Sequence, residues 1–230
     1  MSDWTFTDFG PEFDTHVAAH LPGYADVQRL VSLVAEFAVP PGGTVADLGC
    51  STGRTAATLQ AHLHDRAVDY HLYDEDPSML AEAEQRVPSA KTHLLSLPGT
   101  LDHHDADLTV CLWLLQFVPP GQWVRILHDA RVRSKPTGCV LVAAKTRHAD
   151  PRWEEVAVAA LDEYKTDAGV TDPDRVAKTK ALRGMLYQAS PTWIARDLTA
   201  AGWHTPTLLW RWHVWSLIGA WASPVPTETV

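Results

Sequence analysis

The chain has 230 residues, of which 46% are hydrophobic, and a formal net charge of -9, which fits one large globular domain with a substantial core. The acidic balance and the absence of a basic run argue against direct nucleic-acid binding through phosphates, so a small-molecule partner is favoured. Because we find no signal pattern, no long apolar span and only three irregularly spaced cysteines, we expect a cytoplasmic protein without membrane segments or a disulfide framework.

The N-terminal part of the chain predicts an arm followed by a helix. Residues 1–23 are rich in aromatic side chains and are interrupted by glycine and proline, so we expect an irregular arm or lid. From Tyr24 onward apolar residues recur at helical spacing, which predicts a helix over 24–39. A Pro-Pro-Gly-Gly run at 40–43 ends this helix.

Apolar runs and amphipathic segments alternate through the centre of the chain. The apolar runs predict strands at 44–48, 68–73, 91–95, 107–112 and 139–145. The amphipathic segments predict helices at 54–63, 77–86 and 119–133. Such alternation implies right-handed crossovers and a parallel, doubly wound sheet.

The regular alternation of predicted strands and helices ends after the fifth strand. Two helical segments are predicted within 150–189, then a helix over 191–201 with Gly202 at its C-terminal cap, then two apolar strands at 207–210 and 212–219. We therefore predict an α/β, Rossmann-like doubly wound seven-stranded sheet with an antiparallel last strand, an N-terminal lid and a helical insertion. This single domain, 1–230, comprises the arm and first helix (1–39), the core (40–146), the insertion (147–190) and the C-terminal helix and hairpin (191–230).

A glycine-containing turn follows the first predicted strand: Asp47-Leu48-Gly49-Cys50-Ser51-Thr52-Gly53. Glycine lets the backbone bend and approach a ligand closely, and the next helix offers free N–H groups. Asp74, about 20 residues further on, ends the second strand, where a carboxylate can bind ribose hydroxyls. These features predict a nucleoside-cofactor site; the alternative is an ordinary turn of another α/β protein. The spacing is not G-x-G-x-x-G, and Asp47 would repel a pyrophosphate but could hold a cation.

The D-L-G-C-S-T-G string resembles motif I of the class I methyltransferases, which bind S-adenosylmethionine (SAM). This resemblance implies SAM as the cofactor and Asp74 as the ribose-binding acid. The residues that we expect to bind the cofactor are Tyr24, Asp47, Gly49, Cys50, Ser51, Gly53, Asp74, Glu75, Leu97, Leu112 and Trp113.

Further motifs resemble one branch, the carboxy-SAM synthases of the tRNA wobble-uridine pathway. They are D-W-T-F at 3–6, L-P-G-Y at 21–24, D-L-G-C-S at 47–51, L-Q-F at 115–117, the insertion with Arg183 and Met185, and A-G-W at 201–203. The resemblance implies that Tyr24 closes over the cofactor and that Arg183 holds an extra carboxylate, so both are candidate catalytic residues. It also implies a homodimer and the transfer of a carboxyl group from prephenate to the SAM methyl carbon.

Two departures from that family leave the reaction open. Ser96-Leu97-Pro98 stands where the family has an acid after the third strand, and Leu112 stands where it has asparagine. Two lost polar partners indicate a shifted pocket. The alternatives are a natural-product methyltransferase with a small-molecule acceptor, an enzyme that cyclises SAM to an azetidine and releases methylthioadenosine, and a SAM-binding protein without turnover. Arg183 could also be one more solvated arginine beside Lys178 and Lys180.

The remaining polar and aromatic candidates carry weaker signals. Among ten tryptophans, Trp210, Trp212 and Trp215 lie in predicted strands and are expected in the core. The alternative is that Trp4, Trp113 or Trp193 faces the cationic sulfonium; Trp113 and Gln116 directly follow the fourth strand. The run His103-His104-Asp105 is interpreted as a solvated loop, and we expect no metal site.

Overall fold

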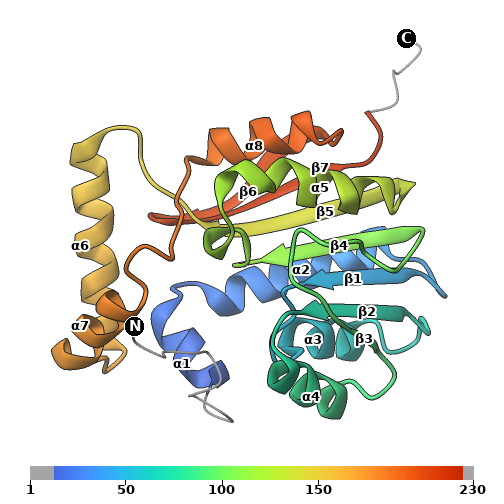
Figure 1. Cartoon of the computed structure of the whole chain (residues 1–230), viewed down its shortest axis with the longest axis horizontal. Coiled ribbons are helices and arrows are strands. Elements are labelled where there is room, and N and C mark those ends of the chain that lie inside the picture. The colour runs from blue at the N-terminus through green and yellow to red at the C-terminus, as the bar shows by residue number, and fades with distance from the viewer. Residues whose placement is uncertain (1–12, 225–230) are drawn as a thin grey trace.

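The computed structural model describes residues 13–224, and its centre is a seven-stranded sheet (Figure 1). The strand order is β3-β2-β1-β4-β5-β7-β6, and β7 runs antiparallel to both of its neighbours. The strands are β1 (Thr44–Leu48), β2 (Asp69–Asp74), β3 (Lys91–Leu94), β4 (Ala106–Leu112), β5 (Ser134–Lys145), β6 (His204–Trp212) and β7 (Trp215–Trp221). The predicted Rossmann-like α/β fold with an antiparallel last strand is therefore confirmed.

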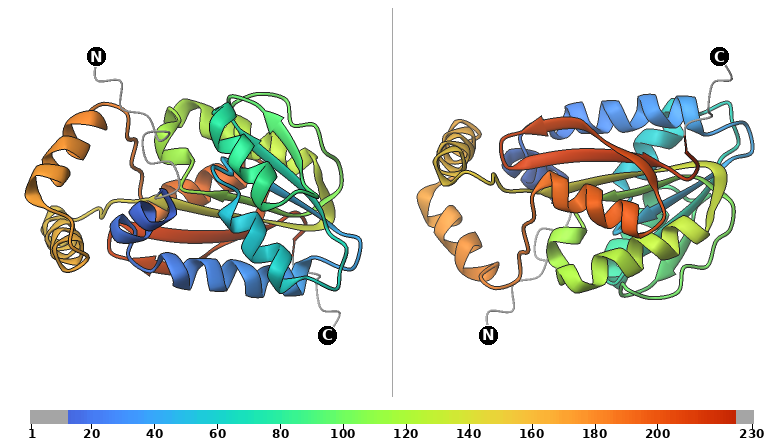
Figure 2. Two further views of the ribbon diagram at one scale, coloured as in Figure 1. Left: turned by 90° about the horizontal axis from the view of Figure 1, so that it is seen from below. Right: turned by 90° about the horizontal axis from the view of Figure 1, so that it is seen from above.

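Helices cover both faces of the sheet (Figure 2). On one face α2, α3 and α4 pack against the strands, and on the other face α5 and α8 do so. The helices are α1 (Phe13–His20), α2 (Tyr24–Ala38), α3 (Arg54–His62), α4 (Pro77–Arg86), α5 (Trp123–Val132), α6 (Pro151–Asp167), α7 (Asp172–Ala181) and α8 (Pro191–Ala200), with 3-10 turns at Leu115–Phe117 and Pro120–Gln122. None of the helices in the described range has the length and apolar character needed to cross a membrane.

Local sequence explains where several helices begin. The Asp76 carboxylate accepts hydrogen bonds from the backbone N–H groups of Ser78 and Met79, and Pro77 occupies the first turn of α4. Thr171 and Ser190 cap α7 and α8 in the same way, again with proline in the first turn. Such caps satisfy N–H groups that have no partner within the helix, and proline has no N–H to satisfy.

The insertion stands away from the sheet. In Figures 1 and 2, α6 and α7 project beyond the strands and lie beside α1. Two contacts join these elements: the Tyr164 hydroxyl donates to the Ala18 carbonyl at 3.0 Å, and Lys178 Nζ lies 2.9 Å from His16 Nε2. Helix α1, the described part of the predicted lid, thus lies beside the helices of the insertion.

Three sequence-based boundaries need correction. Residues 13–20 form helix α1 instead of an irregular arm; residues 1–12 lie outside the described range. Strand β5 begins at Ser134, which pairs with Ala106 before a register shift, so the Pro-Thr-Gly run is a bulge within the strand. The last hairpin turns at 213–214, and Trp212 therefore ends β6 instead of opening β7.

Candidate active site

The turn after β1 is held by the neighbouring strand. The backbone N–H groups of Gly49 and Cys50 both donate to the Tyr73 carbonyl, at 2.8 and 2.9 Å. Gly49 and Gly53 have φ of 74° and 72°, in the left-handed region that favours glycine. A Cβ on Gly53 would stand 3.0 Å from the Cα of Ala83 in α4. The turn therefore requires glycine for both conformation and close packing.

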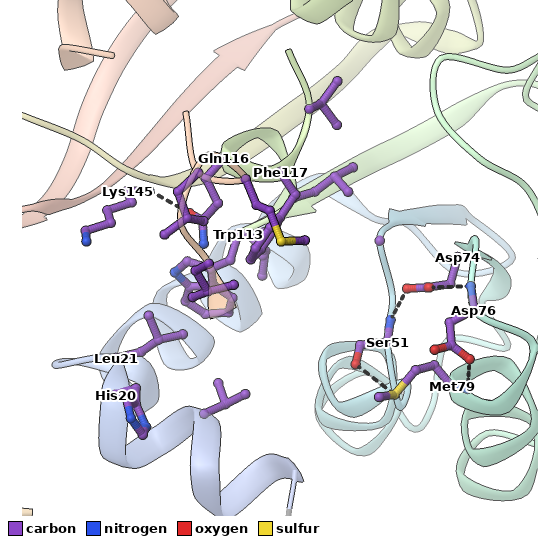
Figure 3. Close-up of a pocket in the computed structure, with 18 of the residues that line it drawn as sticks. His20, Leu21, Ser51, Asp74, Asp76, Met79, Trp113, Gln116, Phe117 and Lys145 are labelled. Atoms are coloured by element: carbon purple, nitrogen blue, oxygen red, sulfur yellow. Dashed lines mark hydrogen bonds between the residues drawn. The ribbon is translucent and has the colours of Figure 1, made fainter. Parts of the chain in front are cut away.

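Asp74 points into this turn from the end of β2 (Figure 3). One carboxylate oxygen accepts from the Ser51 N–H at 2.8 Å, and the other accepts from the Asp76 N–H at 3.0 Å. Burial raises the pKa of Asp74, and the two backbone hydrogen bonds oppose that rise. The carboxylate is thus fixed beside the turn at the end of β2.

Asp47, at the end of β1, is the most deeply buried carboxyl of the turn, with 2% of its surface exposed. Its Oδ2 atom has no hydrogen-bond partner among the described residues. Burial, followed by the charge of Asp74, raises the pKa of Asp47 to about 7. A buried carboxylate without a partner is costly, and a nearby cation would lower that cost. The residues of the turn therefore fit a cationic nucleoside ligand.

A cavity of about 1210 Å³ extends from the turn across the carboxyl ends of the strands to α1, α6 and α7. It brings together nearly all of the predicted site residues. Those that line it are Tyr24, Asp47, Gly49, Cys50, Ser51, Asp74, Glu75, Leu97, Leu112, Trp113 and Arg183. Gly53 does not line the cavity and instead packs behind the turn.

Tyr24 and Trp113 form an aromatic wall of the cavity. Their rings are stacked, with centroids 5.0 Å apart and planes 26° apart. Trp113 directly follows β4 and has φ of 59°, which is strained for a bulky side chain. Burial raises the pKa of Tyr24 to about 12, so its hydroxyl is protonated at neutral pH. The stack covers the space between α2 and the end of β4 with apolar surface.

The two departures from the family pattern make one side of the cavity apolar. Leu97 and Leu112 both line it. Glu75 also lines the cavity, and its carboxylate accepts a hydrogen bond from the Ser96 hydroxyl at 2.7 Å. Any adenine bound here would meet leucine side chains and backbone groups.

Helix α1 connects the turn to the insertion. The Asp14 carboxylate accepts from the Thr52 hydroxyl at 3.0 Å and forms ion pairs with Arg54 at 3.3 Å and Arg86 at 3.0 Å. Two residues further along α1, His16 contacts Lys178 of α7. The same short helix therefore lines both ends of the cavity.

The far end of the cavity contains lysine side chains that the sequence patterns did not single out as site residues. Lys145 ends β5, Lys165 lies in α6 and Lys178 lies in α7, and all three line the cavity. Gln116 is buried and accepts a hydrogen bond from the Lys145 backbone N–H at 2.8 Å. The sequence gives one indication that Lys145 belongs to the site: it is a charged residue directly after the apolar run of β5. Arg183 lies on the same cavity wall with an exposed side chain.

The core expectation for three tryptophans holds for Trp215 and in part for Trp210 and Trp212, which pack against buried clusters. Trp215 is buried but also lines the cavity, whereas Trp210 and Trp212 are only half-buried. Trp193 is 40% exposed and lies outside the cavity, under the Arg196 guanidinium. Trp4 falls outside the described residues.

His103 is buried, not solvated. Only 2% of its surface is exposed, and its Nδ1 lies 2.9 Å from the Tyr73 hydroxyl, because the loop folds back against β2. His104 and Asp105 are exposed, as expected. No cluster of three or more metal-ligating side chains occurs within residues 13–224. All three cysteines are free and buried.

Comparison with known proteins identifies the class. Residues 45–138 match a family model described as a methyltransferase domain. The carboxy-S-adenosyl-L-methionine synthase of Shigella boydii is 24% identical over 83% of this chain and 79% of its own length. That of an Enterobacter species is also 24% identical, over 83% of this chain and 80% of its own length. The chain is a SAM-dependent transferase.

Solved structures support the fold of this transferase. Human N-acetylserotonin methyltransferase, in complex with SAM, has a TM-score of 0.65 and 16% identity, covering 97% of this chain. The chain spans 60% of that protein's length. A TehB-like SAM-dependent methyltransferase from Corynebacterium glutamicum has a TM-score of 0.58 and 15% identity over 94% of this chain and 96% of its own. These likenesses show the fold, and the methyltransferase family model and the carboxy-SAM synthase relatives support SAM as the cofactor or substrate.

Proposed function

We propose that the transferase moves a one-carbon group between SAM and a small carboxylate, most like the carboxy-SAM synthases that it resembles. In that reaction the ring carboxyl group of prephenate leaves as CO2 and the ring hydroxyl leaves as hydroxide, which gives phenylpyruvate. The hydroxide takes a proton from the SAM methyl group to form water, and the methyl carbon bonds to the CO2. One observation carries the proposal: a single cavity joins the glycine turn to an end lined by cationic side chains. The names of the relatives support the same reading.

Each part of the chain has a defined role in this proposal. The Gly49 turn and Asp74 bind and orient the nucleoside, and Asp47 balances the cationic charge of SAM. The stacked rings of Tyr24 and Trp113 exclude water and present apolar surface to the sulfonium. Arg183, on the cavity wall, pairs with the extra carboxylate, since a guanidinium holds a carboxylate bidentately. Catalysis then depends mainly on approach geometry and electrostatics.

Mass spectrometry tests the reaction. The purified protein is incubated with SAM, with and without prephenate, and the small molecules are released and weighed. We expect carboxy-SAM only when prephenate is present. Unmodified SAM under both conditions contradicts carboxyl transfer.

A matched pair of arginine variants tests the role of Arg183. Arg183→Leu should abolish prephenate-dependent turnover while SAM still binds. Arg152→Leu is the control, because Arg152 is exposed and paired with Asp150 away from the cavity. Unchanged turnover of the Arg183 variant contradicts the assignment.

A second candidate is SAM cyclisation. The apolar wall with Trp113, Trp215, Leu97 and Leu112 favours it, because a desolvated sulfonium is a better leaving group. The α-amino nitrogen would bond to the γ-carbon, methylthioadenosine would leave with the sulfur electron pair, and the amine would lose a proton. Methylthioadenosine formed from SAM alone identifies this reaction; ordinary methyl transfer to a natural product instead requires an acceptor.

The assembly and location are also proposals. We propose a homodimer of the cytoplasm, by analogy with the resemblance described above. Light scattering of the purified protein at several concentrations checks the first part, and fractionation of the source cells checks the second. A monomer at all concentrations contradicts the dimer.

A further inference from the structure

Three lysine side chains meet at the end of the cavity farthest from the glycine turn. Lys145, Lys165 and Lys178 come from β5, α6 and α7 and line the same space. Figure 3 shows Lys145, His20 and Leu21 across the cavity from Ser51 and Asp74. Three ammonium groups in one cavity wall are notable in a chain whose net charge is -9.

The lysines have few negative partners. Within residues 13–224, no carboxylate forms an ion pair with Lys145 or Lys178, and that of Lys165 with Asp162 spans 3.9 Å. Burial lowers the pKa of all three lysines, that of Lys178 to about 7, and mutual repulsion adds to the effect for Lys145 and Lys178. Keeping these charges in a partly desolvated wall is therefore unfavourable without a ligand.

The groups that surround the lysines do not remove this imbalance. His16 and His20 of α1 have pKa values lowered to about 3 and about 4, by burial and then by Lys178, so both are neutral at pH 7. Arg175 of α7 adds a further positive charge near Lys165. The nearby carboxylates are Glu154, Asp162 and Asp174, of which the last two are exposed.

Apolar surface borders the same end. Lys145 Nζ lies 5.9 Å from the centre of the Trp215 ring, and Leu161 and Trp113 also line the cavity. A ligand that fills this space needs acidic oxygens for the ammonium groups and an apolar body for the rings. Both features together are typical of a small organic acid.

We propose that Lys145, Lys165 and Lys178 form an oxyanion subsite that binds a doubly charged organic acid, such as a dicarboxylate, beside SAM. The inference rests on the proposed function only in taking SAM to occupy the glycine-turn end. It is independent of Arg183. It assigns the negative charge of the acceptor to a place built by the insertion.

Isothermal titration calorimetry tests the subsite without turnover. The protein is saturated with S-adenosylhomocysteine at pH 7 and titrated with two dicarboxylates, prephenate and phthalate, with two monocarboxylates, phenylpyruvate and benzoate, and with inorganic phosphate. We expect a dicarboxylate to bind at least about tenfold more tightly than its monocarboxylate counterpart, since each charged hydrogen bond is worth about that factor. Tighter binding of phosphate assigns the same subsite to phosphorylated acids.

Lysine variants locate the binding. Lys145→Gln and Lys178→Gln should each weaken dicarboxylate binding by about tenfold and leave S-adenosylhomocysteine affinity unchanged. Lys180→Gln is the matched control, because Lys180 lies in the same helix but does not line the cavity. Equal affinity in all variants overturns the proposal. If the dicarboxylate binds as expected but carboxy-SAM never forms, the proposed function fails and the subsite stands.

Chemical labelling gives a second readout that needs no tight ligand. At pH 7.5 acetic anhydride should modify Lys178 readily, because its pKa is lowered to about 7 and much of the amine is uncharged. Millimolar prephenate, phthalate or phosphate should slow modification of Lys178 and Lys145. If none of the three protects either lysine, no oxyanion binds there and the inference is wrong.

Discussion

The two ends of the cavity are built from different parts of the polypeptide. At the cofactor end, backbone N–H groups, left-handed glycines and one carboxylate from β2 define the site. At the far end, long charged side chains from α6 and α7 meet an apolar wall. The first end depends on sheet geometry and tolerates little change, whereas the second can be altered by exchanging surface-helix residues. This arrangement lets one fold keep SAM and change its second ligand.

The largest expected effect is a loss of stability from a substitution in the glycine turn at the cofactor end. Gly53→Ala should lower the free energy of unfolding by about 3 kcal/mol, because the new methyl group adds a clash to left-handed strain. Gly169→Ala is the control: Gly169 has φ of 80° but nothing within 4 Å of its Cβ position, so only about 1 kcal/mol is expected. Urea denaturation measures both. Equal losses mean that packing against Ala83 contributes nothing.

The next effect separates stability from binding at Asp47. Its pKa is raised to about 7, so the folded state keeps a proton that the unfolded chain loses near pH 4. Stability therefore falls as pH rises from about 4 to 7, and the full penalty persists above 7. Asp47→Asn should be more stable than wild type at pH 8 by on the order of 2 kcal/mol but bind SAM about tenfold more weakly.

Wild-type SAM affinity should rise between pH 6 and 8, because a cation favours the ionised carboxyl of Asp47. Calorimetry at several pH values checks this trend and the loss in Asp47→Asn. A flat profile in the wild type means that Asp47 does not face the cation.

At the lysine end of the cavity we expect a smaller effect on the free energy of unfolding, with the opposite dependence on pH. The pKa of Lys178 is lowered to about 7, so the unfolded chain binds the extra proton between pH 7 and about 10.4. Wild-type stability therefore rises over that window, and the penalty is complete below pH 7. Lys178→Met should be more stable than wild type at pH 6 by on the order of 1 kcal/mol and equal to it near pH 11. Lys180→Met should show no such gain.

The smallest effect concerns the aromatic wall between the two ends. Tyr24→Phe keeps the stack on Trp113 and should leave SAM affinity within about twofold, whereas Tyr24→Leu should weaken it by about five- to tenfold. Tryptophan fluorescence titration with SAM measures both. A larger loss in the phenylalanine variant means that the hydroxyl itself contacts the cofactor.

The sheet, the glycine turn and Asp74 could be predicted because each depends on short-range signals. Apolar runs specify the strands, and the turn lies wholly within 47–53. Helix α1 could not be predicted, because residues 13–20 are held by contacts with Arg54, Arg86 and Lys178, which lie far away in the sequence. His103 was misplaced for the same reason, since only the folded chain brings it to Tyr73.

The lysine cluster shows most clearly which features could not be predicted from the sequence. Lys145, Lys165 and Lys178 lie on three separate elements with no regular spacing, and nothing in the sequence indicates that their side chains converge. Charged residues on an amphipathic helix are normally exposed, so Lys165 and Lys178 gave no local sign of burial. Their meeting depends on how the insertion packs beside α1.

Helix α1 makes the two binding events interdependent. Its Asp14 is fixed by Thr52, Arg54 and Arg86 beside the turn, and its His16 is fixed by Lys178 beside the far wall. A ligand that moves α1 at one end of the cavity would therefore change its contacts at the other end, so the affinities for the two ligands should be coupled. Thermodynamic reciprocity requires the same factor in both directions.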